Sequence, residues 1–154
     1  MTLETNLKTI REIATKNSSE NAAFKDYLKE QDAEKIDIIV HHLNDKITPQ
    51  IDCLKCGNCC ANLRPSATRE ALRKFVKEAD ICKLMYAESM VCKNLKDKKC
   101  TIYNDRPEEC KSYPYMDSNN FINRIQATLF NYEICPIVFN IFECLKKELK
   151  WLPK

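Results

Sequence analysis

Apolar residues recur every three or four positions along most of the chain, a spacing that places them on one face of a helix. One such stripe, over residues 3–14, predicts a first amphipathic helix that ends near Asn17. A second stripe, over residues 24–47, predicts one long helix that follows a start signal at 17–20 and is stopped by Pro49. The N-terminal third of the chain is therefore expected to consist of two helices.

The pattern changes after the second helix. Residues 50–64 hold four cysteines and no helical period, so we expect an irregular loop there. A helical stripe returns over residues 65–80. Two short strands are predicted at 87–94 and 100–104, and a polar turn at 96–99 would join them into a hairpin.

Three further helices are predicted in the C-terminal third. The first starts at Asp105-Arg106-Pro107-Glu108, which combines an N-cap acid, an early proline and a capping-box glutamate, and it is cut off by Pro114. The others span residues 121–129 and about 136–149.

The expected fold is mainly α: a small helical domain frames a cysteine-rich knot and carries one short β-hairpin. We expect residues 1–48 to form an N-terminal helical segment and residues 49–154 to form a cysteine-cluster, metal-binding domain. The two would make one compact unit overall.

Composition sharpens this expectation at one position. The chain has a single glycine, Gly57, among 154 residues, where average usage would give about ten. So few glycines favour helices over tight turns. A glycine kept only inside the cysteine run indicates a backbone there with positive φ, or with another segment packed closely against it.

Several functional classes are not supported by the sequence. The N-terminus has no basic segment followed by an apolar one, and no apolar stretch approaches the length of a membrane span. We therefore expect a cytoplasmic, reducing location and no membrane partner. The net charge of +3 is too small and too evenly spread to indicate nucleic acid. Neither a hydrolase triad nor a glycine-rich phosphate loop is found, so no catalytic residue is predicted and an enzyme is not favoured.

The candidate chemistry lies in the ten cysteines, which in a reducing compartment are better metal ligands or redox thiols than disulfide partners. Eight of them lie in loops or at the edges of predicted elements, and we predict these as metal ligands: Cys53, Cys56, Cys59, Cys60, Cys92, Cys100, Cys110 and Cys135. Cys82 and Cys144 lie in or beside apolar helical patterns and are predicted to be buried core thiols.

The spacing of the first four cysteines allows two kinds of centre. A C-x2-C pair can turn two thiolates onto one zinc ion, which takes four such ligands. The longer C-x2-C-x2-C run also matches the loops that hold iron–sulfur clusters, and Cys135-Pro136 resembles the more distant fourth ligand of such sites. Adjacent side chains in an extended chain point to opposite sides, so Cys59 and Cys60 are expected to serve different sites. The eight thiols are compatible with one or two centres.

His41 and His42 could replace a cysteine at zinc, although solvent-facing or capping roles explain them more simply.

These residues resemble a known family in three blocks. Cys53-x2-Cys56-Gly57-x-Cys59-Cys60 is similar to the signature of the CxxCxxCC cysteine-cluster proteins, a zinc- or iron-chelating domain often called the YkgJ family. The second block is Cys100-x-Ile102-Tyr103-x2-Arg106-Pro107-x2-Cys110-x2-Tyr113-Pro114, with Cys92 eight residues upstream. Cys135-Pro136 resembles the last element, so the likeness covers about residues 53–136. Ala61, Lys111 and Ile137 depart from residues common in the family.

The resemblance implies metal chelation, with zinc or iron as the metal, and leaves the protein partner unknown. A similar cysteine motif occurs in flagellin lysine-N-methylases, which are associated with an iron–sulfur cluster. An iron–sulfur protein with a redox or protein-modifying role is therefore the alternative, and a metal-free thiol redox sensor is the third hypothesis. For Arg106 we expect either hydrogen bonds to metal-bound sulfur or a structural contact with Glu109 or the helix cap.

Overall fold

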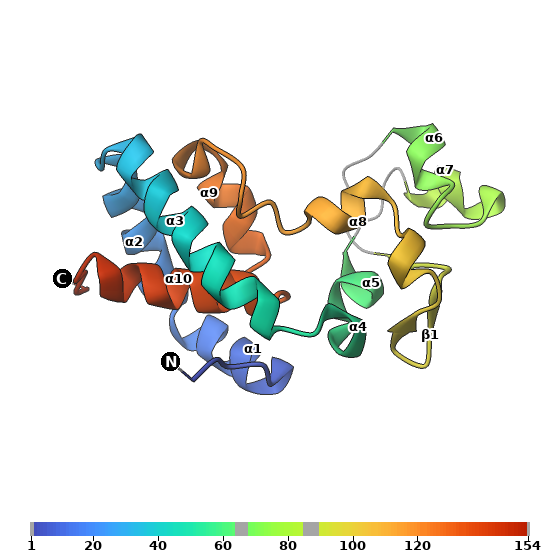
Figure 1. Ribbon diagram of the computed structural model, residues 1–154, viewed down its shortest axis with the longest axis horizontal. Coiled ribbons are helices and arrows are strands. Elements are labelled where there is room, and N and C mark those ends of the chain that lie inside the picture. The colour runs from blue at the N-terminus through green and yellow to red at the C-terminus, as the bar shows by residue number, and fades with distance from the viewer. Residues whose placement is uncertain (1, 64–67, 85–89, 154) are drawn as a thin grey trace. The chain divides into compact units, whose positions relative to one another are not determined.

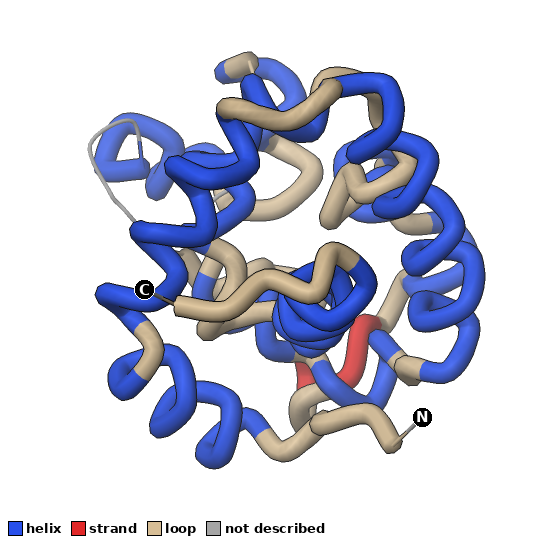
Figure 2. Tube along the Cα trace, turned by 90° about the vertical axis from the view of Figure 1, so that its left-hand side faces the viewer, coloured by secondary structure: helices blue, strands red, loops and turns tan. Residues whose placement is uncertain are grey.

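The chain forms two compact units that are interleaved in sequence. The computed structural model describes residues 2–63, 68–84 and 90–153. Unit 1 comprises residues 1–51 and 114–154, and unit 2 comprises residues 52–113. Figure 2 shows that helices dominate and that the described residues contain one two-stranded sheet, which confirms the mainly α prediction. The C-terminal helices, which the sequence grouped with the cysteines, belong with the N-terminal helices in unit 1.

Unit 1 is a bundle in which α10 packs on α3 and in which α2 and α3 pack on α9 (Figure 1). Its helices are α1 (Leu7–Lys16), α2 (Ser18–Lys29), α3 (Ala33–Ile47), the 3₁₀ turn η1 (Thr48–Gln50), α9 (Phe121–Phe130) and α10 (Pro136–Glu148). Most side chains of α10 are buried. None of the helices in the described ranges is both long enough and apolar enough to cross a membrane.

The long second helix predicted from the sequence is wrong, because the chain breaks into α2 and α3. The apolar stripe has a polar gap between Leu28 and Ile36, and Asp32 uses that gap to begin a new helix. The Asp32 carboxylate accepts hydrogen bonds from the N–H groups of Glu34 (3.1 Å) and Lys35 (3.2 Å). These bonds satisfy N–H groups that have no partner inside the helix.

A buried charge lies inside the bundle of unit 1. Lys146 on α10 is 5% exposed, and its ammonium lies 2.9 Å from the carboxylate of Glu20 on α2 and 2.8 Å from that of Glu143. The Tyr132 hydroxyl donates to the same Glu143 oxygen at 2.7 Å. Burial, followed by this hydrogen bond, raises the pKa of Tyr132 well above its usual range. The buried ammonium is therefore fully paired, as its burial requires.

Unit 2 is built from short elements. They are α4 (Cys53–Cys56), α5 (Asn58–Asn62), α6 (Arg69–Leu72), the 3₁₀ turn η2 (Glu78–Asp80), α7 (Ile81–Leu84), β1 (Leu95–Lys96), β2 (Lys99–Cys100), the 3₁₀ turn η3 (Tyr103–Asp105) and α8 (Glu108–Ser112). Phe75, Val76, Ile81 and Met90 make its small apolar core, and Cys92 and Cys110 pack against that core.

The helix predicted over residues 65–80 is also wrong, and its first positions, 65–67, lie outside the described residues. Only α6 forms, because the next three carbonyl groups accept hydrogen bonds from outside the helix. Lys93 donates its backbone N–H to the Phe75 carbonyl (2.7 Å) and its ammonium to the Arg73 carbonyl (2.6 Å). The Asn94 amide donates to the Lys74 carbonyl at 3.1 Å. A local helical period cannot reveal partners that lie twenty residues further along the chain.

The predicted hairpin exists but is shorter than expected. Leu95 pairs with Cys100 and Lys96 pairs with Lys99 in antiparallel register. Asp97 and Lys98 form the turn with φ values of 48° and 62°, as expected of a two-residue hairpin turn of the primed kind. Part of the first predicted strand, 87–89, lies outside the described residues.

The three C-terminal helices are close to their predicted positions. The first begins two residues late, because Tyr103–Asp105 form a 3₁₀ turn and Pro107 rather than Asp105 is the N-cap of α8. The helices α9 and α10 match the apolar stripes of the sequence to within one residue.

Candidate metal centre

Gly57 allows the first four cysteines to lie on two consecutive short helices. It adopts φ +56° between α4 and α5, so the irregular loop predicted for residues 50–64 is wrong. A Cβ at this position would lie 2.5 Å from the backbone oxygen of Lys98. Both the positive φ and the close approach expected of this glycine are confirmed. The hairpin turn can therefore rest directly on the cysteine-bearing segment.

Backbone contacts bring later cysteines to the same place. The Cys92 N–H donates to the Cys60 carbonyl at 2.8 Å. Leu95 then donates to the Cys92 carbonyl at 3.0 Å and pairs with Cys100 across the hairpin. Because α4 also contacts β2 (Figure 1), the segments that bear Cys53, Cys60, Cys92 and Cys100 are held together by the fold of unit 2.

The thiols of unit 2 interact electrostatically, which shows that they lie near one another. Burial raises the pKa of Cys110 to about 11, and the charges of Cys60, Cys92 and Cys100 raise it further. Burial also raises the pKa of Cys92, where Cys60 and Cys100 add to the effect. Partial enclosure of the sulfur raises the pKa of Cys53 although the residue as a whole is exposed, and the charges of Cys56 and Cys60 act in the same direction.

Cys60 behaves differently from these neighbours. A hydrogen bond from the Cys59 thiol lowers the pKa of Cys60 to about 7, against the opposing effect of burial. The two adjacent cysteines lie in α5 rather than in extended chain, so their side chains do not point to opposite sides. The reason given from the sequence for separating them is therefore wrong, because the backbone there is helical.

The thiols gather without closing on a common point. No three His, Cys, Asp or Glu side chains among residues 2–63, 68–84 and 90–153 form a group arranged to hold a metal ion. None of the ten cysteines, all of which lie within these ranges, forms a disulfide. The donor set nevertheless fits the metals in question, because thiolate sulfur is the ligand that structural zinc and iron–sulfur centres use.

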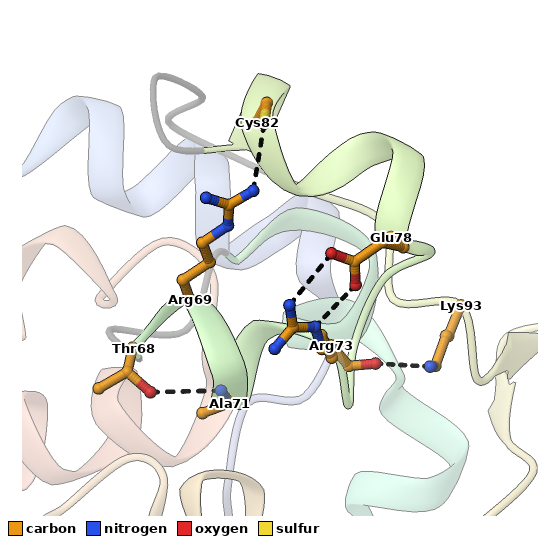
Figure 3. Close-up of polar contacts among 7 residues, drawn as sticks. All are labelled: Thr68, Arg69, Ala71, Arg73, Glu78, Cys82 and Lys93. Carbon is orange, nitrogen blue, oxygen red and sulfur yellow. Dashed lines mark hydrogen bonds and ion pairs between the residues drawn. The ribbon is translucent and has the colours of Figure 1, made fainter.

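The other cysteines are divided between the two units. Cys135, the eighth predicted ligand, belongs to unit 1, where it is 6% exposed and precedes α10; its role as a ligand stays a prediction. Cys144 is buried in α10, as predicted. The core position predicted for Cys82 is wrong, because Cys82 is exposed. Figure 3 shows the Arg69 guanidinium 3.7 Å from its sulfur.

The two histidines lie on α3 in unit 1, where His42 is exposed, as its simpler interpretation predicts. His41 is half-buried. Seven of the eight predicted ligands belong to unit 2.

Arg106 combines a structural and an electrostatic role. Its guanidinium donates to the Tyr103 carbonyl at 2.9 Å and lies 4.1 Å from the centre of the Tyr103 ring. Its charge lowers the pKa of Cys53. The carboxylate of Glu109, a partner suggested by the sequence, lies 3.5 Å from the Lys74 ammonium.

Asn94 is a candidate site residue that the sequence analysis missed. It hydrogen-bonds to the Cys92 thiol through both backbone and side chain, and these bonds lower the pKa of Cys92. The signal that could have revealed it is its position two residues after a ligand, where an N–H can reach back to the sulfur.

The geometry defines a class of site: a thiol-rich, non-disulfide cluster assembled from three segments of unit 2. The chain belongs to the CxxCxxCC family, described as a "putative zinc- or iron-chelating domain", which it matches over residues 52–136. This confirms the resemblance noted in the sequence. Neither the search of curated proteins nor that of solved structures finds a match.

Proposed function

We propose that this protein binds zinc or iron through cysteine thiolates. The ligands would come from the seven thiols of unit 2, namely Cys53, Cys56, Cys59, Cys60, Cys92, Cys100 and Cys110, with Cys135 as an eighth. The observation that carries the proposal is the set of interactions that join Cys60 to Cys53, Cys59, Cys92 and Cys110. These thiols come from separate segments, which the backbone bond between Cys92 and Cys60 helps to hold together.

The packing of unit 2 supports a structural role for the metal. Its buried apolar side chains, among the described residues, are Leu72, Phe75, Val76, Ile81 and Met90. So small a core provides little folding free energy, and small units commonly depend on a metal or on disulfides to fold. In such proteins the free energy of metal binding becomes free energy of folding.

The charge of unit 2 is also suited to a thiolate cluster. Its sequence holds thirteen Lys and Arg and nine Asp and Glu residues, a net charge of +4. The remainder of the chain carries −1, from twelve basic and thirteen acidic residues. Positive charge therefore accompanies the cysteines, where it offsets the negative charge of thiolates.

The experiment is elemental analysis of the full chain purified without oxygen and without added metal. We expect zinc or iron in stoichiometric amount, lost when several cysteines of unit 2 are replaced by serine and retained in Cys144→Ser, whose thiol is buried in unit 1. Metal-free protein that is folded, or equal metal content in both variants, would overturn the proposal.

An iron–sulfur protein is the second candidate, because three cysteines of a C-x2-C-x2-C run lie on the adjoining helices α4 and α5. The same preparation distinguishes it, since a cluster gives a brown protein with acid-labile sulfide. A colourless protein that holds stoichiometric zinc would eliminate this candidate.

A further inference from the structure

We propose that Cys60 is a bridging ligand, shared between two metal ions that are held by the seven thiolates of unit 2. The inference rests on the proposed function, since it assumes that these thiols bind metal. It adds the number of ions, their connection and the residue that joins them.

The thiols form two groups around Cys60. The first group lies on α4 and α5, where Cys53 interacts with Cys56 and Cys60, and where Cys59 donates a hydrogen bond to Cys60. The second group lies on the segment before the hairpin, on β2 and on α8, and its members Cys92, Cys100 and Cys110 interact with one another.

Cys60 interacts with both groups. Its charge acts on Cys53 in the first group and on Cys92 and Cys110 in the second. Its backbone carbonyl accepts the Cys92 N–H at 2.8 Å, so the second group is attached at the residue that the first group surrounds. Cys60 is half-buried between them.

The number of donors matches this arrangement. A zinc ion in a structural site takes four ligands in tetrahedral geometry, so two ions need eight ligand positions. Seven thiolates fill eight positions if one of them is shared. Each ion would then have three thiolates of its own group and the sulfur of Cys60.

The total charge is acceptable for such a centre. Seven thiolates and two divalent ions together carry −3, and the other side chains of unit 2 carry +4. The sulfurs must still be drawn inward by the ions, because no three of them form a closed group in the described ranges. The backbone provides the neighbourhood, and rotation of the side chains would complete the coordination.

The test is metal reconstitution of the full chain, with cadmium as the probe in place of zinc. Native mass spectrometry should give two cadmium ions per chain, and cadmium NMR should show two signals coupled to each other through the shared sulfur. In Cys60→Ser the coupling should disappear, and one ion should be lost or bound at least tenfold more weakly. Cys59→Ser should weaken one ion and preserve the coupling, while Cys82→Ser, an exposed thiol outside the groups, should resemble the wild type.

Each other outcome overturns the inference. One ion per wild-type chain, or two ions without coupling, would rule out a bridging Cys60 and leave the proposed metal binding intact. No bound ion at all would overturn the proposed function as well. The wild-type spectrum decides the matter even if Cys60→Ser does not fold.

Discussion

Gly57 shows how one residue allows the cysteine-bearing helices and the hairpin to meet. Its φ of +56° lies in the left-handed region, and the Lys98 carbonyl occupies the space that a side chain would need. Both features were expected from a single glycine placed inside the cysteine run. The partner of the close approach could not be predicted, because it lies more than forty positions away in the chain.

Replacing Gly57 by alanine should destabilise unit 2 by about 2 kcal/mol or more, because the left-handed conformation alone costs about 1–2 kcal/mol for other residues and the new Cβ would clash with backbone. Denaturant unfolding of the metal-loaded protein measures the loss. Lys96→Ala, an exposed change in the same hairpin, is the control. Equal midpoints for Gly57→Ala and the control would contradict the close approach.

Tyr132 should make stability depend on alkaline pH. Its pKa is raised in the folded protein, while in the unfolded chain it titrates near its ordinary value of about 10. The unfolded state therefore binds fewer protons than the folded state above this pH, so the free energy of unfolding is unaffected below about pH 10 and falls as the pH rises further.

Tyr132→Phe keeps the ring and removes the titrating group. It should be less stable by about 1 kcal/mol at neutral pH, since one hydrogen bond is lost, and its stability should fall less steeply than that of the wild type above pH 10. Urea unfolding at several pH values gives the two slopes. Identical slopes would show that Tyr132 is not protonated differently in the folded state.

At the scale of elements, the sequence predicts helices well where both ends and the apolar face are local. The helices α9 and α10 have continuous stripes, and Pro136 marks the start of α10. The predictions fail where a distant group decides the structure. The helix beginning at α6 stops because Lys93 and Asn94 take its carbonyl groups.

The same reasoning applies to the candidate site. Spacing alone identifies the cysteines as ligands, but it cannot show that Cys60 is their common neighbour, since this depends on the bond to Cys92. The misplacement of Cys82 has a related cause. Its apolar neighbours indicate a helix face, and only the tertiary structure shows that its own side chain points away from the core.

The break between α2 and α3 depends on Asp32. Asp32→Ala removes the acceptor for two N–H groups at the start of α3 and should cost about 1 kcal/mol in the free energy of unfolding. Asp45→Ala, an exposed position in the same helix, should leave that free energy nearly unchanged. If urea unfolding gives the two variants the same stability, the capping role of Asp32 is wrong.

At the scale of the whole molecule, the two units should respond differently to loss of metal. Unit 1 has a large aromatic core that includes Phe24, Phe121 and Phe142. Unit 2 has few buried apolar side chains among its described residues and, in our account, depends on thiolate–metal bonds. The chain therefore joins a self-sufficient helical bundle to a unit stabilised by metal.

A strong chelator should unfold unit 2 and leave unit 1 folded. Far-ultraviolet circular dichroism should lose part of its helical signal, while the fluorescence of Trp151, the one tryptophan of the chain, should change little. Trp151 reports on unit 1, because its ring centre lies 5.0 Å from that of Phe24. A helical signal unchanged after confirmed metal loss would contradict a structural role for the metal.

The central claim is that thiolate sulfur from this cluster binds the metal. X-ray absorption at the zinc or iron edge of the purified, full-length chain tests it most directly, because the first coordination shell identifies the ligand atoms. Our account predicts a shell of sulfur atoms, which for zinc lies at about 2.3 Å. A shell made only of nitrogen and oxygen atoms, which for zinc lies at about 2.0–2.2 Å, would contradict it.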